Sequence, residues 1–161
     1  MTKVNLIHGE GDVLDTHLNI NPFTKKTEDG LLVRGDLTNI DKYVDDAEAE
    51  EIIAMDVIDY ISTTKTAETI ANWISKLAIG GRIVIGGIDI IAVSKSLADY
   101  SLDIASANLL IHGKQDEPYL IKRASFSAYD LAEYLEVTYG LGIVKKDIQN
   151  YKMFVEAQRT I

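Results

Sequence analysis

The residues most suited to binding a ligand lie near the start of the chain, where a short apolar run leads into two closely spaced glycines. Residues 4–7 have the composition of a buried strand, and a loop with Gly9 and Gly11 follows directly. Because glycine has no Cβ, such a loop lets a ligand approach the backbone. A second apolar run, residues 18–21, comes soon after. This order predicts an open α/β sheet that binds its ligand over the carboxyl ends of its strands.

Short apolar runs bounded by turn residues predict the elements that must position this loop. Strands are expected at residues 4–7, 18–21, 31–34, 51–55, 82–85, 143–148 and 151–157. Helices are expected at residues 67–77, 90–111 (as one helix or two consecutive ones) and 128–139. Gly80 and Gly81 are expected to end the first helix, and Ser127 with Asp130 forms a capping box at the start of the last.

The last two strands fix one detail of the topology. Only Gln149 and Asn150 separate them, and so short a connection permits only an antiparallel hairpin. The complete order predicts an α/β fold with a doubly wound, mostly parallel sheet of about seven strands and a reversed terminal strand. With 161 residues and no linker-like segment, residues 1–161 are expected to form a single domain.

Composition excludes several classes of function. The chain has no cysteine, so disulfides and thiolate metal sites are excluded and a reducing cytoplasm is the expected compartment. The three histidines are far apart in sequence, so no metal site is predicted. Residues 41–51 carry six acids against one lysine, and we expect a solvated segment there. No apolar run approaches the ~18 residues that a membrane span needs.

The net charge of −9 indicates which classes of binding partner to expect. A nucleic-acid backbone is usually held by a basic face, so a nucleic-acid partner is not expected. A small-molecule, glycan or protein partner fits the charge better. The apolar stripe along residues 90–111 could supply the face of a homodimer.

Taken together, these segments resemble the class I S-adenosylmethionine-dependent methyltransferases. The likeness is to the compact group in which a brief turn, rather than a full helix, joins the first two strands. It covers nearly all of the 161 residues through the order and spacing of its motifs. The matching segments are His8-Gly9-Glu10-Gly11, Asn21, Gly35-Asp36-Leu37, Met55-Asp56, residues 73–85, His112-Gly113-Lys114-Gln115, residues 119–126 and residues 151–159.

The resemblance implies S-adenosylmethionine as the cofactor and assigns roles to residues. The residues implied in binding the donor are Ile7, His8, Gly9, Gly11, Asn21, Asp36, Leu37 and Met55. In these roles Asn21 faces the ribose, Asp36 faces the adenine amino group, and Met55 lines the floor near the sulfonium. Asp36 as a turn-forming aspartate and Met55 as a core residue are the open alternatives.

Catalytic roles follow from the same resemblance. Asp56 is the first candidate for a base, because it follows a strand beside the implied donor. His112 is the second, because an imidazole titrates near neutral pH, although an ordinary polar role at the end of a helix is its alternative. Tyr119 is a candidate for the acceptor pocket, and a half-buried structural aromatic is the competing interpretation.

Two departures from the family pattern keep a second function open. Ile7 stands where the family usually has glycine, and Asn21 stands where it has an acid. The first hypothesis is an S-adenosylmethionine-dependent methyltransferase acting on a small molecule or glycan. The second is a non-catalytic protein of the same fold that serves as a scaffold or partner subunit. A nucleotide-binding enzyme of Rossmann type is a third, but the third glycine and the acid that it needs are missing.

Overall fold

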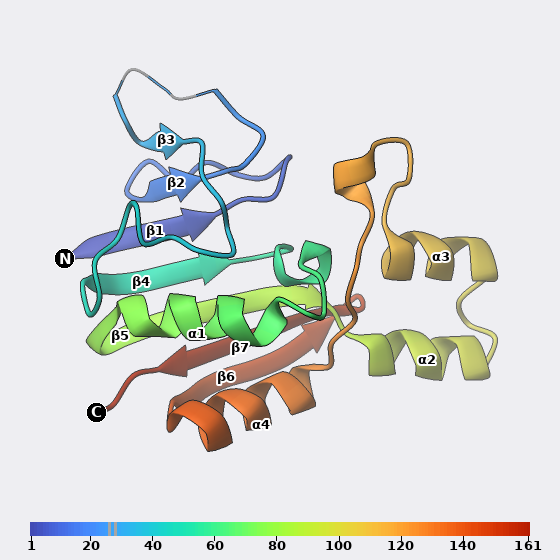
Figure 1. Cartoon of the computed structure of the whole chain (residues 1–161). Coiled ribbons are helices and arrows are strands. Elements are labelled where there is room, and N and C mark those ends of the chain that lie inside the picture. The colour runs from blue at the N-terminus through green and yellow to red at the C-terminus, as the bar shows by residue number, and fades with distance from the viewer. Residues whose placement is uncertain (26, 28) are drawn as a thin grey trace.

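The computed structural model describes residues 1–25, 27 and 29–161, whose strands form one seven-stranded sheet in the order β3-β2-β1-β4-β5-β7-β6 (Figure 1). The strands are β1 (Thr2–Leu6), β2 (Leu18–Ile20), β3 (Leu32–Val33), β4 (Ala49–Ala54), β5 (Leu77–Ile88), β6 (Gly142–Gln149) and β7 (Lys152–Gln158). β7 runs antiparallel to both β5 and β6, and the other pairs are parallel. The predicted α/β sheet with a reversed terminal strand is therefore confirmed.

The strand order changes direction between β1 and β4, as a doubly wound sheet requires. The helices are α1 (Thr66–Lys76), α2 (Ile90–Ala98), α3 (Ile104–His112) and α4 (Ala128–Tyr139), with the short 3-10 turns η1 (Ile58–Tyr60) and η2 (Pro118–Leu120). At such a change of direction the loops after the two strands separate and leave a crevice, which is where open α/β sheets bind ligands. The loops after β1 and β4 therefore frame the candidate site.

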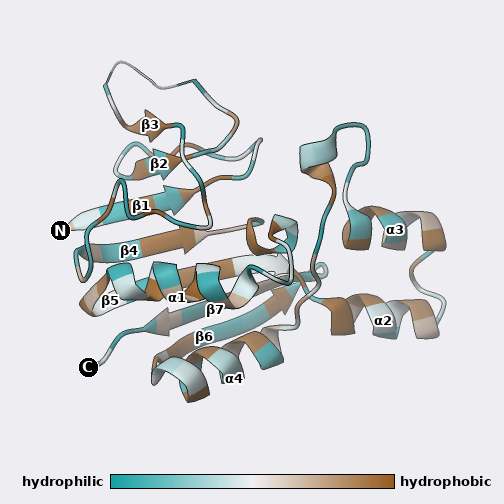
Figure 2. Ribbon diagram, in the orientation of Figure 1, coloured by the Kyte–Doolittle hydropathy of each residue, from teal (hydrophilic) through white to brown (hydrophobic). Residues whose placement is uncertain are grey.

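The main core lies between α1, α4 and one face of the sheet (Figures 1 and 2). Alternate residues of each strand point into it, and in β1 these are Val4 and Leu6. Trp73 of α1 is fully buried, and its indole N–H donates a hydrogen bond to the Leu37 carbonyl at 2.8 Å. This bond fixes the segment after β3 against α1.

Two asparagines on the opposite face explain how a loop without a helix can join β1 to β2. Asn19 is fully buried, and its amide nitrogen donates to the carbonyls of Leu14, His17 and Leu31. The Asn5 amide nitrogen donates to the Asn19 side-chain oxygen at 2.8 Å. These side chains satisfy backbone groups that a helix would have satisfied itself. The connection can therefore cross this face as a plain loop.

The structure corrects the predicted end of the first helix. α1 ends at Lys76, four residues before Gly80, and residues 77–88 are already strand. The Lys76 ammonium is buried and pairs with Asp41 at 2.7 Å and Asp46 at 2.5 Å. Part of the acidic segment is therefore not merely solvated, because it holds the end of α1. Gly80 instead bends β5, with a φ of +83° that favours glycine.

Two further details differ from the sequence prediction. Residues 90–111 form two helices, and Tyr100 adopts a positive φ of 61° in the turn between them. α2 and α3 pack on each other around a small cluster of their own that contains Val93 and Ala107. The hairpin turn is Asn150-Tyr151, one residue later than predicted, and both residues have positive φ as in a type I′ turn.

Within the part of the chain that the structure describes, no helix is long and apolar enough to cross a membrane. The same residues contain no cluster of three or more histidine, aspartate or glutamate side chains arranged to hold a metal ion. A homodimer face along α2 and α3 stays a prediction.

Candidate functional site

The glycine loop lies directly beyond β1 and is closely packed. The side chain of Ile7 is 4% exposed, and a Cβ on Gly11 would lie only 2.8 Å from it. Gly9 has a φ of +77°, and a Cβ there would lie 3.1 Å from the ring of Tyr119. Glycine is thus required at both positions, at Gly9 for its backbone conformation and at Gly11 for the close approach of Ile7.

Asn21 connects the end of β2 to this loop. Its side chain is 6% exposed, and its amide nitrogen donates to the Gly9 carbonyl at 2.7 Å. Its amide oxygen accepts from the N–H groups of Gly9 at 3.3 Å and Phe23 at 3.0 Å. A carboxylate could not make this reciprocal pair with Gly9, because it has no donor. Asparagine therefore serves to hold the glycine loop against β2.

A cavity of about 280 Å³, which we call the glycine-loop cavity, lies between this loop and the end of β4. It is lined by Asn5, Leu6, Ile7, His8, Glu10, Gly11, Asp12, Leu14, Ile53, Met55 and Asp56. Three of these residues carry carboxylates and five are apolar, which suits a ligand with both positive charge and apolar surface. Of the predicted donor-binding residues, Gly9, Asn21, Asp36 and Leu37 do not line it.

Met55 and Asp56 form the end of this cavity on the β4 side. The Met55 thioether lies directly against Gly86 of β5, where any side chain would displace it. Asp56 adopts a positive φ of 55°, which aspartate tolerates better than most residues. Its carboxylate accepts a hydrogen bond from the Lys152 ammonium at 2.9 Å, and both side chains are partly exposed. A partly exposed carboxylate at a strand end can accept a proton from a bound molecule.

Comparison with solved structures shows which fold carries this site. One similar structure is an O-methyltransferase family protein from Burkholderia thailandensis, with a TM-score of 0.54 and 15% identity over 80% of this chain and 35% of that one. A second is 1,6-didemethyltoxoflavin-N1-methyltransferase from the same organism with bound 1,6-didemethyltoxoflavin and S-adenosylhomocysteine, with a TM-score of 0.61 and 10% identity over 99% of this chain and 72% of that one. A third is an O-methyltransferase family 2 protein from Planctomyces limnophilus in complex with apigenin, with a TM-score of 0.56 and 15% identity over 97% of this chain and 50% of that one. The chain has the class I methyltransferase fold.

No protein-family model matches the chain, and no curated protein matches it in sequence. The chain spans 35% and 50% of the two O-methyltransferases, so much of each lies outside the shared fold.

On this methyltransferase fold, His8 belongs to an aromatic cluster that covers the glycine loop. Its ring stacks on Tyr60 with centroids 4.2 Å apart and meets Phe23 edge-on at 5.0 Å. Phe23 in turn contacts Tyr119, with centroids 4.5 Å apart. The four rings come from four separate segments, so sequence spacing gave no signal of the cluster.

The protonation of His8 follows from its contacts. Its Nε2 lies 2.6 Å from the Tyr119 carbonyl, and because a carbonyl only accepts, Nε2 carries the proton. Burial lowers the pKa of His8, the hydrogen bond to Tyr119 opposes this shift, and nearby Arg123 adds to it. His8 is therefore neutral near pH 7, and its Nδ1 is an acceptor.

Asp36 and Leu37 have structural partners. Asp36 is exposed, and its carboxylate accepts from both the backbone N–H and the hydroxyl of Thr38 at 2.8 Å, as in an Asx turn. Leu37 is buried in the main core. Their roles in binding a donor stay predictions.

His112 is the last residue of α3 and is exposed. Its carbonyl accepts a hydrogen bond from the Lys122 N–H, but within residues 1–25, 27 and 29–161 its imidazole has no hydrogen-bond partner. It does not line the glycine-loop cavity. Asp56 lines this cavity and His112 does not, and the role of either residue as a base stays a prediction.

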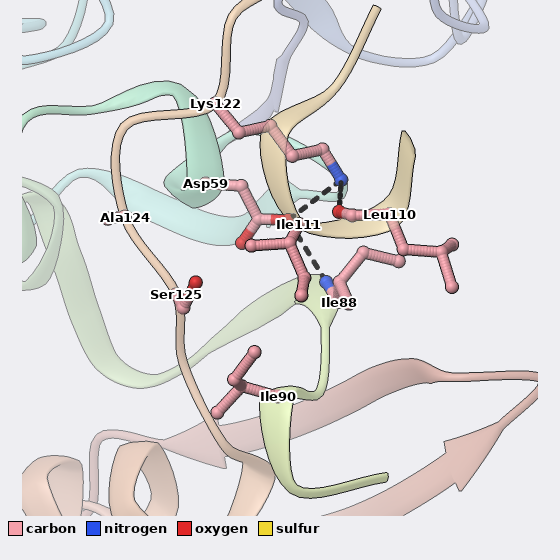
Figure 3. A pocket seen from close by; sticks show the side chains of 8 residues that line it. All are labelled: Asp59, Ile88, Ile90, Leu110, Ile111, Lys122, Ala124 and Ser125. Carbon is pink, nitrogen blue, oxygen red and sulfur yellow. Dashed lines mark hydrogen bonds and ion pairs between the residues drawn. The ribbon is translucent and has the colours of Figure 1, made fainter. Parts of the chain in front are cut away.

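A buried ion pair holds the segment that carries Tyr119 (Figure 3). Asp59 of η1 is 1% exposed, and its carboxylate accepts from the Ile88 N–H at 3.0 Å and pairs with Lys122 at 3.3 Å. The Lys122 ammonium also donates to the Leu110 carbonyl at 3.1 Å. In Figure 3 the dashed contacts form a chain from the Leu110 carbonyl through Lys122 and Asp59 to the Ile88 N–H, so η1, the end of β5 and the last turn of α3 are joined.

Lys122→Met is expected to lower the free energy of unfolding by about 2 kcal/mol near pH 7, because it leaves a buried carboxylate without its cation. Burial raises the pKa of Asp59, and the Ile88 N–H and Lys122 oppose this shift. The Asp59 carboxyl group thus binds a proton more tightly in the folded state than in the unfolded chain. The stability from protonation is fully present below the unfolded pKa and is lost as pH rises through the folded pKa.

The free energy of unfolding that Lys122→Met loses should therefore become smaller as the pH is lowered from about 7.5 toward about 4, where Asp59 becomes neutral. Urea unfolding at both pH values measures it. Lys95→Met is the matched control, because Lys95 is exposed on α2 and its loss should change little at either pH. An equal loss at both pH values would contradict this account of the buried pair.

Proposed function

We propose that this chain is an S-adenosylmethionine-dependent methyltransferase that acts on a small molecule or a glycan. The observation that carries the proposal is the glycine-loop cavity, which lies at the change of strand order of a methyltransferase fold. The donor would supply an electrophilic methyl group on a sulfonium. Solved neighbours with this fold include one with bound S-adenosylhomocysteine.

The residues of the cavity fit the cationic end of such a donor. Glu10, Asp12 and Asp56 place negative charge around it, which favours a sulfonium or an ammonium group. Ile7 and Met55 give it apolar walls that limit access of water. Neutral His8 brings no positive charge that would repel the ligand. Asp56, oriented by Lys152, would accept the proton of an acceptor hydroxyl.

Amide chemical shifts measured during a titration with S-adenosylhomocysteine test the proposal. The expected shifts are at Gly9, Gly11, Met55 and Asp56. Shifts confined to the far ends of the strands, or none at millimolar ligand, would overturn it.

A non-catalytic role is the second candidate, and specific contacts favour it. The amide of Asn21 is taken up by Gly9 and Phe23, and Tyr119 lies against Gly9. A donor ribose would have to displace these contacts before binding. Absence of donor binding would therefore leave a methyltransferase-fold scaffold or partner subunit as the better interpretation.

A further inference from the structure

A second cavity lies beside the glycine-loop cavity. It measures about 530 Å³, and we call it the hairpin cavity because the β6–β7 hairpin forms most of it. Its lining residues are Met55, Lys145, Asp147, Gln149, Asn150, Lys152, Met153 and Phe154. The strand register places Gln149 opposite Lys152 and Asp147 opposite Phe154, so these side chains share one face of the sheet.

The two cavities meet at Met55 and Asp56. Met55 lines both, so its side chain forms a wall common to them. Asp56 lines the glycine-loop cavity, and its partner Lys152 lines the hairpin cavity. A molecule in the hairpin cavity would therefore lie next to the candidate base.

The chemistry of the hairpin cavity favours an anionic ligand. Lys145 and Lys152 both line it, in a chain whose net charge is −9. Lys145 lies 5.3 Å over the Phe154 ring, and among the described residues no carboxylate pairs with it. Asp147, the one acid of the lining, is already hydrogen-bonded by the Ile148 N–H at 2.9 Å and by Gln149 at 3.1 Å. Lys152 is already paired with Asp56, so Lys145 is the lysine of the lining that stays available for an anion among the described residues.

The uncharged residues of the lining favour a ligand with several hydroxyl groups. Gln149 and Asn150 are exposed at the tip of the hairpin and offer both amide donors and amide acceptors. Phe154 is partly exposed and offers an apolar ring surface beside them. Polar groups on either side of an apolar ring match a molecule with hydroxyls at its rim and carbon at its face.

We propose that the hairpin cavity is the acceptor subsite and that it binds an anionic, hydroxyl-bearing small molecule, such as a sugar carboxylate or a sugar phosphate. The assignment as an acceptor subsite rests on the proposed methyltransferase function, whereas the binding of the anion does not. Lys145 holds the anionic group, Phe154 holds the ring, and a hydroxyl faces Asp56, which Lys152 orients.

The test is a titration of the isotope-labelled protein, followed by amide chemical shifts, with D-glucuronate, D-glucose 6-phosphate and D-glucose as probes. The expected result is that one or both anions shift the amides of Lys145, Gln149 and Lys152, with glucose at least tenfold weaker. Glucuronate alone would identify a carboxylate site, and the phosphate alone a phosphate site. Equal binding of glucose would overturn the assignment of an anion, and no shift at tens of millimolar probe would overturn the subsite.

Two single-charge variants separate a site from a general charge effect. Lys145→Gln should weaken binding of the anion about tenfold, the loss of one charge-assisted contact. Lys146→Gln is the matched control, because Lys146 lies 4.7 Å over the Tyr129 ring of α4, away from the cavity, and binding should stay within twofold. Equal losses in both variants would show a non-specific charge effect and overturn the proposal.

Titration with S-adenosylhomocysteine in the same samples keeps the two proposals apart. Donor binding without binding of any anion would defeat the hairpin subsite and leave the proposed function standing. Binding of an anion without donor binding would defeat the methyltransferase proposal, and with it the role of the hairpin cavity as an acceptor subsite.

Discussion

Asp89→Ala is expected to lower the free energy of unfolding by about 4 kcal/mol, because one buried carboxylate holds two helix starts. Asp89 is 1% exposed, and its two oxygens accept from the Ala92 N–H of α2 at 2.8 Å and from the Ala128 N–H of α4 at 2.7 Å. Alanine would leave two N–H groups without acceptors at this junction, each at the cost of a charge-assisted hydrogen bond. Urea unfolding followed by circular dichroism measures the change.

Asp103→Ala provides the comparison. Asp103 caps α3 through one backbone bond, to the Ser106 N–H at 2.8 Å, and it is exposed. Its loss should cost about 1 kcal/mol, the usual value for one helix cap. Equal effects of the two variants would show that Asp89 does not join α2 to α4.

Gly9→Leu is expected to weaken binding of S-adenosylhomocysteine at least a hundredfold, or about 2.7 kcal/mol. The side chain would meet the Tyr119 ring and would force a β-carbon into a φ of +77°. Loops that contact a ligand through their backbone have no room for such a group. Calorimetric titration of the variant measures the loss.

Gly80→Leu is the control that separates the effect of backbone strain from steric blocking of the ligand. Gly80 has a φ of +83°, similar to that of Gly9, but a Cβ there has nothing within 4 Å, and the residue lies in β5 rather than in the glycine loop. This variant should lose a similar amount of stability from the backbone and keep the affinity for the ligand within twofold. Unchanged affinity in Gly9→Leu would show that the ligand binds elsewhere.

The elements of the fold were predictable because their signals are local. The capping box was predicted from two residues, and the Asp130 N–H does bond to the Ser127 hydroxyl at 3.1 Å. The predicted end of α1 was wrong because the contacts that decide where the helix ends come from Asp41 and Asp46, thirty or more residues away along the chain. Gly80 gave a plausible local stop, but its positive φ serves a bend in β5.

The loop between β1 and β2 had a signal that could have been used. In 4–6 and 18–20 an asparagine stands between two apolar residues, the alternation of strands with one polar face. Asn5 and Asn19 indicate that no apolar helix covers that face. The strands were instead interpreted only as buried runs.

The candidate site was predictable in its position but not in its contacts. The glycine loop and Met55-Asp56 lie around one cavity, as their places after β1 and β4 indicate. The bonds of Asn21 to Gly9 and the packing of Tyr119 on the loop depend on the folded arrangement of distant segments. In the hairpin, the predicted turn would place Lys152 opposite Asp147, whereas the observed turn places it opposite Gln149. The side chains of Asp147 and Lys152 lie on the same face of the sheet in either register, but their cross-strand partners differ.

The central claim is that this chain binds the methyl donor at the glycine-loop cavity. Calorimetric titration of the unmodified protein with S-adenosylmethionine and with S-adenosylhomocysteine tests it most directly. The account predicts one site per chain with micromolar affinity for at least one of the two ligands. No heat of binding with either ligand at millimolar concentration would contradict it and would favour a scaffold or partner subunit with a methyltransferase fold.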